Sequence, residues 1–187
     1  MTASDPPRPD RTKTGGHMLV EYRTVLSLGS NLGDRLDNLQ EAIDALFDAP
    51  SLTFVALSPV YETAPWGGIE QPDFLNVVVM ADTRIPPETL LDRVLSIEDS
   101  MRRERVIRWG PRTLDIDIVT FGDIVSSGPD LTLPHPHAHE RAFVLVPWAD
   151  IDPDAVLPGH GSVAALVATV GTGDVTLRNE LTLQPPA

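Results

Sequence analysis

The chain has 187 residues, 42% of them hydrophobic, which is enough for one domain with a sizeable core and too little for two comfortable ones. A formal net charge of −13 at pH 7 argues against sequence-independent binding to nucleic acid or to an anionic membrane. The absence of cysteine excludes disulfides and thiolate metal sites, and no apolar run is long enough to span a membrane. We therefore expect a cytoplasmic monomer that binds small molecules, with neither nucleic acid nor membrane as a partner.

The first 22 residues are rich in Pro, Thr, Asp and Gly and show no periodicity, which predicts a disordered tail over 1–22. A single domain is expected over 23–180, beginning with a strand at 23–29. A Gly-Ser-Asn turn then leads into a helix with Asp34 as its N-cap and apolar residues at helical spacing over 36–47. The turn is not expected to cradle phosphate, because the lysine of a P-loop pattern is missing.

Two strands are expected next, at 52–57 and 74–82. The loop between them is rich in Pro and Gly and carries Trp66, a composition typical of loops that shape a ligand pocket on a rigid scaffold. Asn76 stands among apolar neighbours, so its amide needs hydrogen-bond partners from the fold or from a ligand. A helix is expected to open at the Pro-Pro pair that follows and to reach Glu98 near its end.

The stretch 102–118 combines dense positive charge with alternating aspartates. Its basic residues, five of the fourteen in the chain, are Arg102, Arg103, Arg105, Arg108 and Arg112. Asp115 and Asp117 then alternate with apolar residues, which predicts a strand with both carboxylates on one face, roughly 6–7 Å apart. Such a pair suits Mg²⁺, and the arginines suit a polyphosphate bound beside it. The alternative is a half-exposed strand of solvated aspartates next to a basic loop.

Short elements are expected in the remainder: segments at 124–125 and 131–133 around a turn at 126–130, helices at 141–151 and 162–170, and a frayed end at 184–187. Histidines occupy alternate positions in the Pro-His-Pro-His-Ala-His run at 134–139. A transition-metal site there is disfavoured, since two prolines interrupt any regular strand. At least one histidine facing the phosphate-binding cleft is the preferred interpretation. Strands separated by helices predict a mixed α/β sandwich in one domain.

Several motifs in this order resemble the 6-hydroxymethyl-7,8-dihydropterin pyrophosphokinase family, over about residues 23–160. They are G-S-N-L-G-D at 29–34, T-A-P-W-G at 63–67, Q-P-D-F-L-N at 71–76, R-W-G-P-R-T-L-D-I-D-I at 108–118, and P-H at 134–135 followed by R-A-F at 141–143. The resemblance implies an α+β, ferredoxin-like fold with a mainly antiparallel sheet and flanking helices. It also implies transfer of pyrophosphate from ATP to the hydroxymethyl group of the pterin, with release of AMP, as a step of folate biosynthesis.

The resemblance also implies roles for individual residues. Two Mg²⁺ ions would bridge Asp115 and Asp117 to the phosphates of ATP, the co-substrate. The residues implied in catalysis are Arg103 (in preference to Arg102), Arg112, Asp115 and Asp117. The pterin ring would stack between Phe74 and Phe143 and meet Thr63, Trp66 and Asn76. The nucleotide side would be lined by Glu98, Arg105, Trp109, Ile118, Thr132, His135 and Arg141.

Two other interpretations stay open. A Mg²⁺-dependent nucleotide phosphohydrolase would use the same aspartates and release phosphate without a pterin. A non-catalytic nucleotide- or pterin-binding module would bind its ligand without turnover. In all three interpretations the aspartates lie on a rigid strand, whereas Arg103 and Arg105 lie on a loop that we expect to move.

Overall fold

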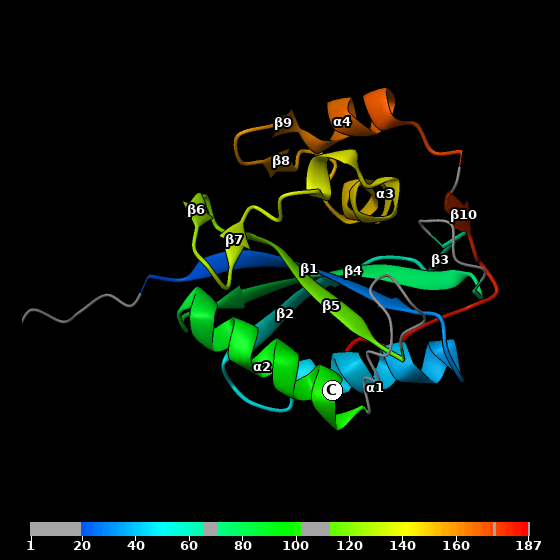
Figure 1. Cartoon of the computed structure of the whole chain (residues 1–187), viewed down its shortest axis with the longest axis horizontal. Coiled ribbons are helices and arrows are strands. Elements are labelled where there is room, and N and C mark those ends of the chain that lie inside the picture. Colours follow the sequence, from blue (N-terminus) through cyan, green and yellow to red (C-terminus); the bar gives the residue numbers. More distant parts are fainter. Residues whose placement is uncertain (1–19, 66–70, 102–112, 174, 187) are drawn as a thin grey trace, which may run out of the picture.

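An antiparallel sheet forms the middle layer of the structure and carries helices on both faces (Figure 1). The computed structural model describes residues 20–65, 71–101, 113–173 and 175–186. The sheet has the strand order β10-β3-β4-β1-β5, and β2 pairs with β4 beside this path. Its strands are β1 (Tyr22–Ser30), β2 (Leu52–Leu57), β3 (Tyr61–Thr63), β4 (Phe74–Thr83), β5 (Asp115–Phe121) and β10 (Val175–Leu177).

The helices form two layers, one on each side of the sheet. On one side lie α1 (Arg35–Phe47) and α2 (Pro87–Ser100); on the other lie α3 (Ala142–Ile151) and α4 (Val163–Val170) (Figure 1). The second side also carries β6 (Ser126–Ser127) with β7 (Thr132–Leu133), β8 (Val156–Leu157) with β9 (Gly161–Ser162), and a 3-10 turn, Ala138–Glu140. Within the described ranges, no helix has the length and apolar character that crossing a membrane requires.

Alternation along the central strands divides the core between the two layers. On β4, Val77 and Val79 belong to the cluster that includes the buried faces of α1 and α2, whereas Val78 and Met80 belong to the cluster that includes α3. A strand buried on both faces reads as a continuous apolar run, as β4 does. Polar residues on the α3-facing side of this sheet are therefore exceptions, and their positions identify the site.

Most predicted elements are confirmed, including the single-domain α+β fold with a mainly antiparallel sheet. The predicted cap is also confirmed, because a side-chain oxygen of Asp34 accepts a hydrogen bond from the backbone N–H of Asp37 at 3.2 Å. The short segment predicted at 124–125 is wrong. The strand there is β6, which begins two positions later and lies inside the turn predicted at 126–130. Residues 1–19 of the predicted tail lie outside the described part of the chain, and the predicted end of the tail at residue 22 is wrong, because β1 begins at Tyr22.

The prediction of a frayed C-terminal end is wrong for Gln184. The side chain of Gln40 on α1 exchanges two hydrogen bonds with the backbone of Gln184, at 2.8 and 3.1 Å. Leu183 beside it is only 7% exposed and belongs to the core around α1 and α2. Burial of this leucine holds a segment whose composition alone suggests a loose end.

Candidate active site

Three neighbouring strands place polar residues in rows across the α3-facing side of the sheet. Asn76 on β4 pairs with Gly29 on β1, and Gly29 pairs with Asp115 on β5. Two residues along these strands, on the same face, Ser27 pairs with Asp117. Directly paired residues share a face, and strands lie about 4.8 Å apart, so the backbones of Asn76 and Asp115 are separated by about 10 Å. The amide and the carboxylates therefore border one surface.

Gly29 keeps the surface between Asn76 and Asp115 open. A Cβ atom at this position would lie 3.1 Å from Oδ1 of Asn76 and 3.6 Å from Cδ1 of Phe74. The first distance is tighter than an ordinary contact, so a side chain would press against the amide. The glycine thus leaves room for a ligand where any other residue would fill it.

The amide end of the site is buried and already oriented by the fold. Asn76 donates a hydrogen bond from Nδ2 to the hydroxyl of Thr63 at 2.8 Å, and these residues are 4% and 7% exposed. Thr63 pairs with Phe74 across β3 and β4, so the Phe74 ring shares the face of the amide. The predicted partner for the buried amide is therefore supplied by the fold on one side of the group.

The carboxylate end lies on β5, as the alternating pattern predicts. Asp115 and Asp117 are partly exposed, while Ile116 and Ile118 between and beyond them are buried on the opposite face. Arg141 donates from Nη1 to Oδ2 of Asp117 at 3.1 Å. The guanidinium carbon of the same arginine lies 5.5 Å from the centre of the Phe143 ring, a cation–π distance. Arg141 thus joins the aspartate pair to the first turn of α3.

His135 completes this group. Its Nδ1 accepts a hydrogen bond from the backbone N–H of His137 at 3.1 Å, and its Nε2 lies 3.4 Å from Nη1 of Arg141. Nε2 lies 3.7 Å from Oδ2 of Asp117. Burial lowers the pKa of His135. The charge of Asp117 raises this pKa, but Arg141 and His137 lower it further, so the pKa lies below its usual value. A neutral ring is thus favoured beside the carboxylate.

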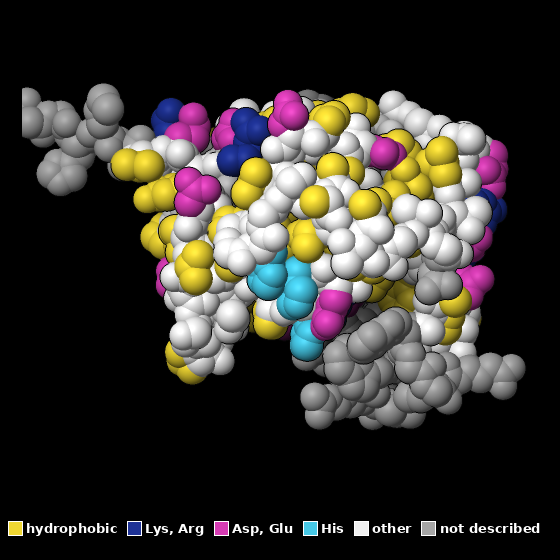
Figure 2. All heavy atoms as spheres, turned by 90° about the horizontal axis from the view of Figure 1, so that it is seen from above, with side chains coloured by type: hydrophobic (Ala, Val, Ile, Leu, Met, Phe, Trp, Pro, Cys, Tyr) yellow, Lys and Arg dark blue, Asp and Glu magenta, His cyan; other side chains and the backbone are white. Residues whose placement is uncertain are grey.

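The other histidines have separate partners. Histidine side chains gather on the face shown in Figure 2, beside acidic residues. His137 contacts Glu140 at 2.6 Å, whereas His139 stacks on His160 with ring centres 4.2 Å apart. Of the alternating histidines, His135 is the one that lies beside Asp117. That it faces a phosphate-binding cleft stays a prediction.

The donor set on β5 suits a substrate-linked Mg²⁺ rather than a closed metal cage. In the part of the chain that the structure describes, no group of three or more His, Cys, Asp or Glu side chains is placed to hold a metal ion. Asp115 and Asp117 offer hard oxygen ligands at the partly exposed edge of the sheet. Mg²⁺ commonly takes one or two carboxylates and completes its shell with phosphate oxygens and water, so the residues present fit that ion.

The remaining predicted site residues lie in different surroundings. Glu98 is 2% exposed at the end of α2, and its Oε1 accepts from the backbone N–H of Ile116 at 2.8 Å. The side chain of Ile118 lies in the core on the face opposite the aspartates. Thr132 is exposed on β7. The predicted residues outside the described ranges are Trp66, Arg103, Arg105, Trp109 and Arg112.

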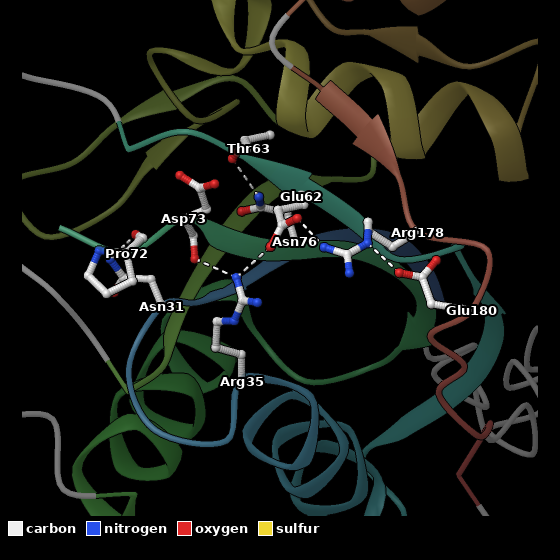
Figure 3. Close-up of polar contacts among 9 residues, drawn as sticks. All are labelled: Asn31, Arg35, Glu62, Thr63, Pro72, Asp73, Asn76, Arg178 and Glu180. Carbon is white, nitrogen blue, oxygen red and sulfur yellow. Dashed lines mark hydrogen bonds and ion pairs between the residues drawn. The ribbon is translucent and has the colours of Figure 1, made fainter.

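The sequence-based interpretation missed a group of polar contacts behind the amide end of the site (Figure 3). Asn31 donates from Nδ2 to Oε1 of Gln71 at 3.1 Å and to the carbonyl of Pro72 at 3.0 Å. Arg35 donates to the Glu62 carboxylate at 2.7 Å. Asn31 lies in the G-S-N-L-G-D motif at 29–34, so the sequence could have pointed to it. No local pattern indicates that Glu62 pairs with Arg35.

Comparison with known proteins identifies a matching family. The model of the 7,8-dihydro-6-hydroxymethylpterin-pyrophosphokinase (HPPK) family matches residues 25–153. The 2-amino-4-hydroxy-6-hydroxymethyldihydropteridine pyrophosphokinase of Mycobacterium leprae is 50% identical over 150 residues, which cover 74% of this chain and 76% of that protein. The enzyme of the same name from Pseudomonas aeruginosa is 44% identical over 146 residues, covering 78% of this chain and 90% of that protein.

Solved structures share the fold. An HPPK-DHPS variant of Plasmodium falciparum matches with a TM-score of 0.64 at 16% identity over 82% of this chain and 46% of that chain. An HPPK-DHPS in complex with substrates matches with a TM-score of 0.62 at 15% identity, over 80% of this chain and 43% of that chain. The present chain therefore spans less than half of these longer proteins, and the likeness concerns the architecture of their matching part.

Proposed function

The chain belongs to the 7,8-dihydro-6-hydroxymethylpterin-pyrophosphokinase family, and from this premise we propose how its site works. The reaction is transfer of pyrophosphate from ATP to 6-hydroxymethyl-7,8-dihydropterin, giving the pterin diphosphate and AMP in folate biosynthesis. The observation that carries the proposal is the row Asn76–Gly29–Asp115 across β4, β1 and β5. It offers a hydrogen-bonding amide at one end, a metal-binding carboxylate at the other, and a gap between them.

The amide end is the pterin site in this proposal. A pterin is flat, with apolar faces and a hydrogen-bonding edge, so it gains from aromatic stacking and from a fixed amide. Phe74 and Phe143 supply the aromatic faces, and Asn76 with Thr63 supplies polar groups at the edge. The Asn76–Thr63 hydrogen bond fixes the amide before the ligand arrives, which lowers the entropic cost of binding. By the family resemblance, the backbone around Trp66 is also proposed to contact the pterin.

The aspartate end is the phosphate site. Asp115 and Asp117 would hold Mg²⁺, two ions by family resemblance, and the bound metal would neutralise charge on the phosphates of ATP. Arg141 holds Asp117 at 3.1 Å and is available to meet the nucleotide when the carboxylate turns to the metal. His135 lies in the same region, with Nε2 3.7 Å from Oδ2 of Asp117. Thr132 and Glu98 are proposed on the nucleotide side, with Glu98 acting from behind β5.

The remaining proposed roles follow the family resemblance. Arg103 and Arg112 would stabilise charge that develops on the transferred group, and Arg105 and Trp109 would contact the nucleotide. Ile118 would contribute through its backbone on the edge strand β5, since its side chain lies in the core. Arginines beside the phosphates match a reaction that depends on positioning and charge neutralisation.

The reaction is a displacement at the β-phosphorus of ATP. The hydroxymethyl oxygen of the pterin attacks this atom and forms the new oxygen–phosphorus bond. The bond between the β-phosphorus and the oxygen that bridges the α- and β-phosphorus atoms breaks, and that oxygen leaves with its electron pair as part of AMP. The hydroxymethyl proton is released. The protein aligns the two oxygens and excludes competing water, which lowers the barrier by positioning.

Incubation with ATP, Mg²⁺ and hydroxymethyldihydropterin, followed by assay of AMP, tests the proposal. AMP that forms only when the pterin is present supports it. Release of phosphate without pterin would favour a nucleotide phosphohydrolase, and tight binding without turnover would favour a binding module. The domain limits at 23–180, the monomeric state and a cytoplasmic location stay predictions from the sequence.

A further inference from the structure

The C-terminal segment pairs with the strand that carries Thr63 although it lies beyond the region matched by the family model. That match ends at residue 153. Farther along the chain, β10 pairs with β3, and Leu177 lies opposite Tyr61. The backbone N–H of Arg178 then donates to the carbonyl of Val60 at 2.9 Å. The segment therefore forms the outer edge of the sheet next to the strand that carries Thr63.

Glu62 on β3 joins this segment to α1 through two guanidinium groups. Its Oε1 accepts from Nη1 of Arg35 at 2.7 Å, and its Oε2 accepts from Nη1 of Arg178. The side chains of Arg35, Glu62 and Arg178 are 27%, 20% and 28% exposed, so water screens these contacts only in part. Arg178 also contacts Glu180 through Nε at 2.6 Å (Figure 3).

Arg35 also connects the two ends of the β3–β4 connection. The same Nη1 that binds Glu62, before the connection, donates to the carbonyl of Asp73, after it, at 2.8 Å. Glu62 is followed by Thr63, and Asp73 is followed by Phe74; these two residues pair across β3 and β4. One guanidinium thus holds both ends of the connection at the place where two pterin-site residues meet (Figure 3).

The network lies on the face of the sheet opposite the site. Alternation along β3 directs Tyr61 and Thr63 to the α3-facing side, where Tyr61 donates to a carboxylate oxygen of Asp150 on α3. Glu62 between them points to the α1 side. Its ion pairs therefore act on the backbone of β3 and cannot touch a ligand that lies over Asn76.

We propose that the C-terminal segment is a positioning element of the pterin pocket, acting through Arg178, Glu62 and Arg35 on the paired ends of β3 and β4. This inference rests on the proposed function, because it concerns the pterin of that reaction. Loss of the network would let Thr63 and Phe74 move relative to Asn76, while the aspartates on β5, two strands from β4, keep their places. The expected signature is weaker pterin binding with little change in ATP binding or turnover.

The test compares steady-state kinetics of Arg178→Ala and Glu62→Gln with those of the wild-type chain. KM for the pterin should rise about fivefold in Arg178→Ala, which loses one ion pair to Glu62, and at least as much in Glu62→Gln, which loses the pairs to both Arg35 and Arg178. KM for ATP and kcat should change less than twofold in both variants. KM for the pterin in the Arg178→Ala/Glu62→Gln double variant should not exceed that of the single variant with the higher KM, because both residues act through one path. Arg178→Lys should recover most of the affinity.

Matched controls separate positioning from general loss of charge pairs. Glu180→Gln removes the second partner of Arg178, and Arg23→Ala removes an ion pair to Asp82, 2.5 Å, at the other end of β1 and β4. Both should leave KM for the pterin unchanged. If Glu62→Gln does not fold, Arg178→Ala decides. An unchanged pterin KM in a folded Arg178→Ala variant overturns the inference, whereas absence of pterin-dependent AMP from the wild-type chain overturns the proposed function instead.

Discussion

Glu98 and Ile116 are joined by a hydrogen bond that links the end of α2 to the backbone between the two aspartates. Oε1 of Glu98 accepts from the N–H of Ile116 at 2.8 Å, and the glutamate is 2% exposed. Glu98 belongs to α2, which packs on one face of the sheet. The carboxylates of Asp115 and Asp117 lie on the opposite, α3-facing side. A buried acidic side chain thus fixes the strand that carries the proposed metal ligands.

We predict that Glu98→Ala destabilises the protein by about 2–3 kcal/mol, because it leaves a buried N–H without its acceptor. Urea denaturation at pH 7 measures this loss. Glu98→Gln keeps an acceptor oxygen and should recover at least half of the stability. Equal stability of the wild-type protein and Glu98→Ala would show that the hydrogen bond does not support β5.

Gly29→Ala should weaken pterin binding. The added methyl would lie 3.1 Å from Oδ1 of Asn76 and would take space that the proposed ring occupies. We expect KM for the pterin to rise about tenfold or more, with about 1–2 kcal/mol of lost stability from overpacking. Gly173→Ala is the matched control, since a Cβ there meets nothing within 4 Å. Equal pterin KM values for the two variants would contradict an open ligand surface at Gly29.

The Glu62 network predicts a pH-dependent contribution to stability. Burial would raise the pKa of Glu62, but hydrogen bonds and charge from Arg35 and Arg178 outweigh burial and lower it below its usual value near 4.5. A lowered pKa means that the native state binds fewer protons than the unfolded state. The contribution is therefore present above pH 4.5 and is lost as the pH falls through the lowered pKa.

Urea denaturation at pH 6 and at pH 3.5 checks this sign. The wild-type protein should lose more stability between these two values than Glu62→Gln, which has no carboxylate to protonate at that position. Arg23→Ala serves as a control, because it removes a different ion pair and keeps Glu62. Parallel losses in the wild-type protein and Glu62→Gln would mean that the guanidinium groups do not lower the pKa of Glu62.

The parts of the fold that were predictable depend on local patterns. The Asp34 cap acts within one helical turn, and the alternation around Asp115 and Asp117 sets which side of a strand each residue faces. Both effects operate over a few residues, so the sequence displays them directly. The pairing of Asn76 with Gly29 needed the strand order as well, which the family resemblance implied and local periodicity did not.

The C-terminal contribution could not be predicted because it depends on distant contacts. Glu62 meets Arg35 across 27 positions and Arg178 across 116. The three residues of β10 are too few to give a strand pattern, and they become a strand only because β3 offers an unpaired edge. The end near Gln184 looked frayed for the same reason, since its partner is a glutamine on α1.

The most direct test of the account is production of AMP from ATP, Mg²⁺ and hydroxymethyldihydropterin by the wild-type chain and by Asp115→Asn and Asp117→Asn. The account predicts pterin-dependent AMP from the wild-type chain and a loss of kcat of about 10³-fold or more in both variants, because each removes a charged metal ligand while keeping the size of the side chain. The variants should keep the thermal unfolding midpoint within a few degrees. AMP formation at the wild-type rate by a folded Asp117→Asn variant would contradict the assignment of the site.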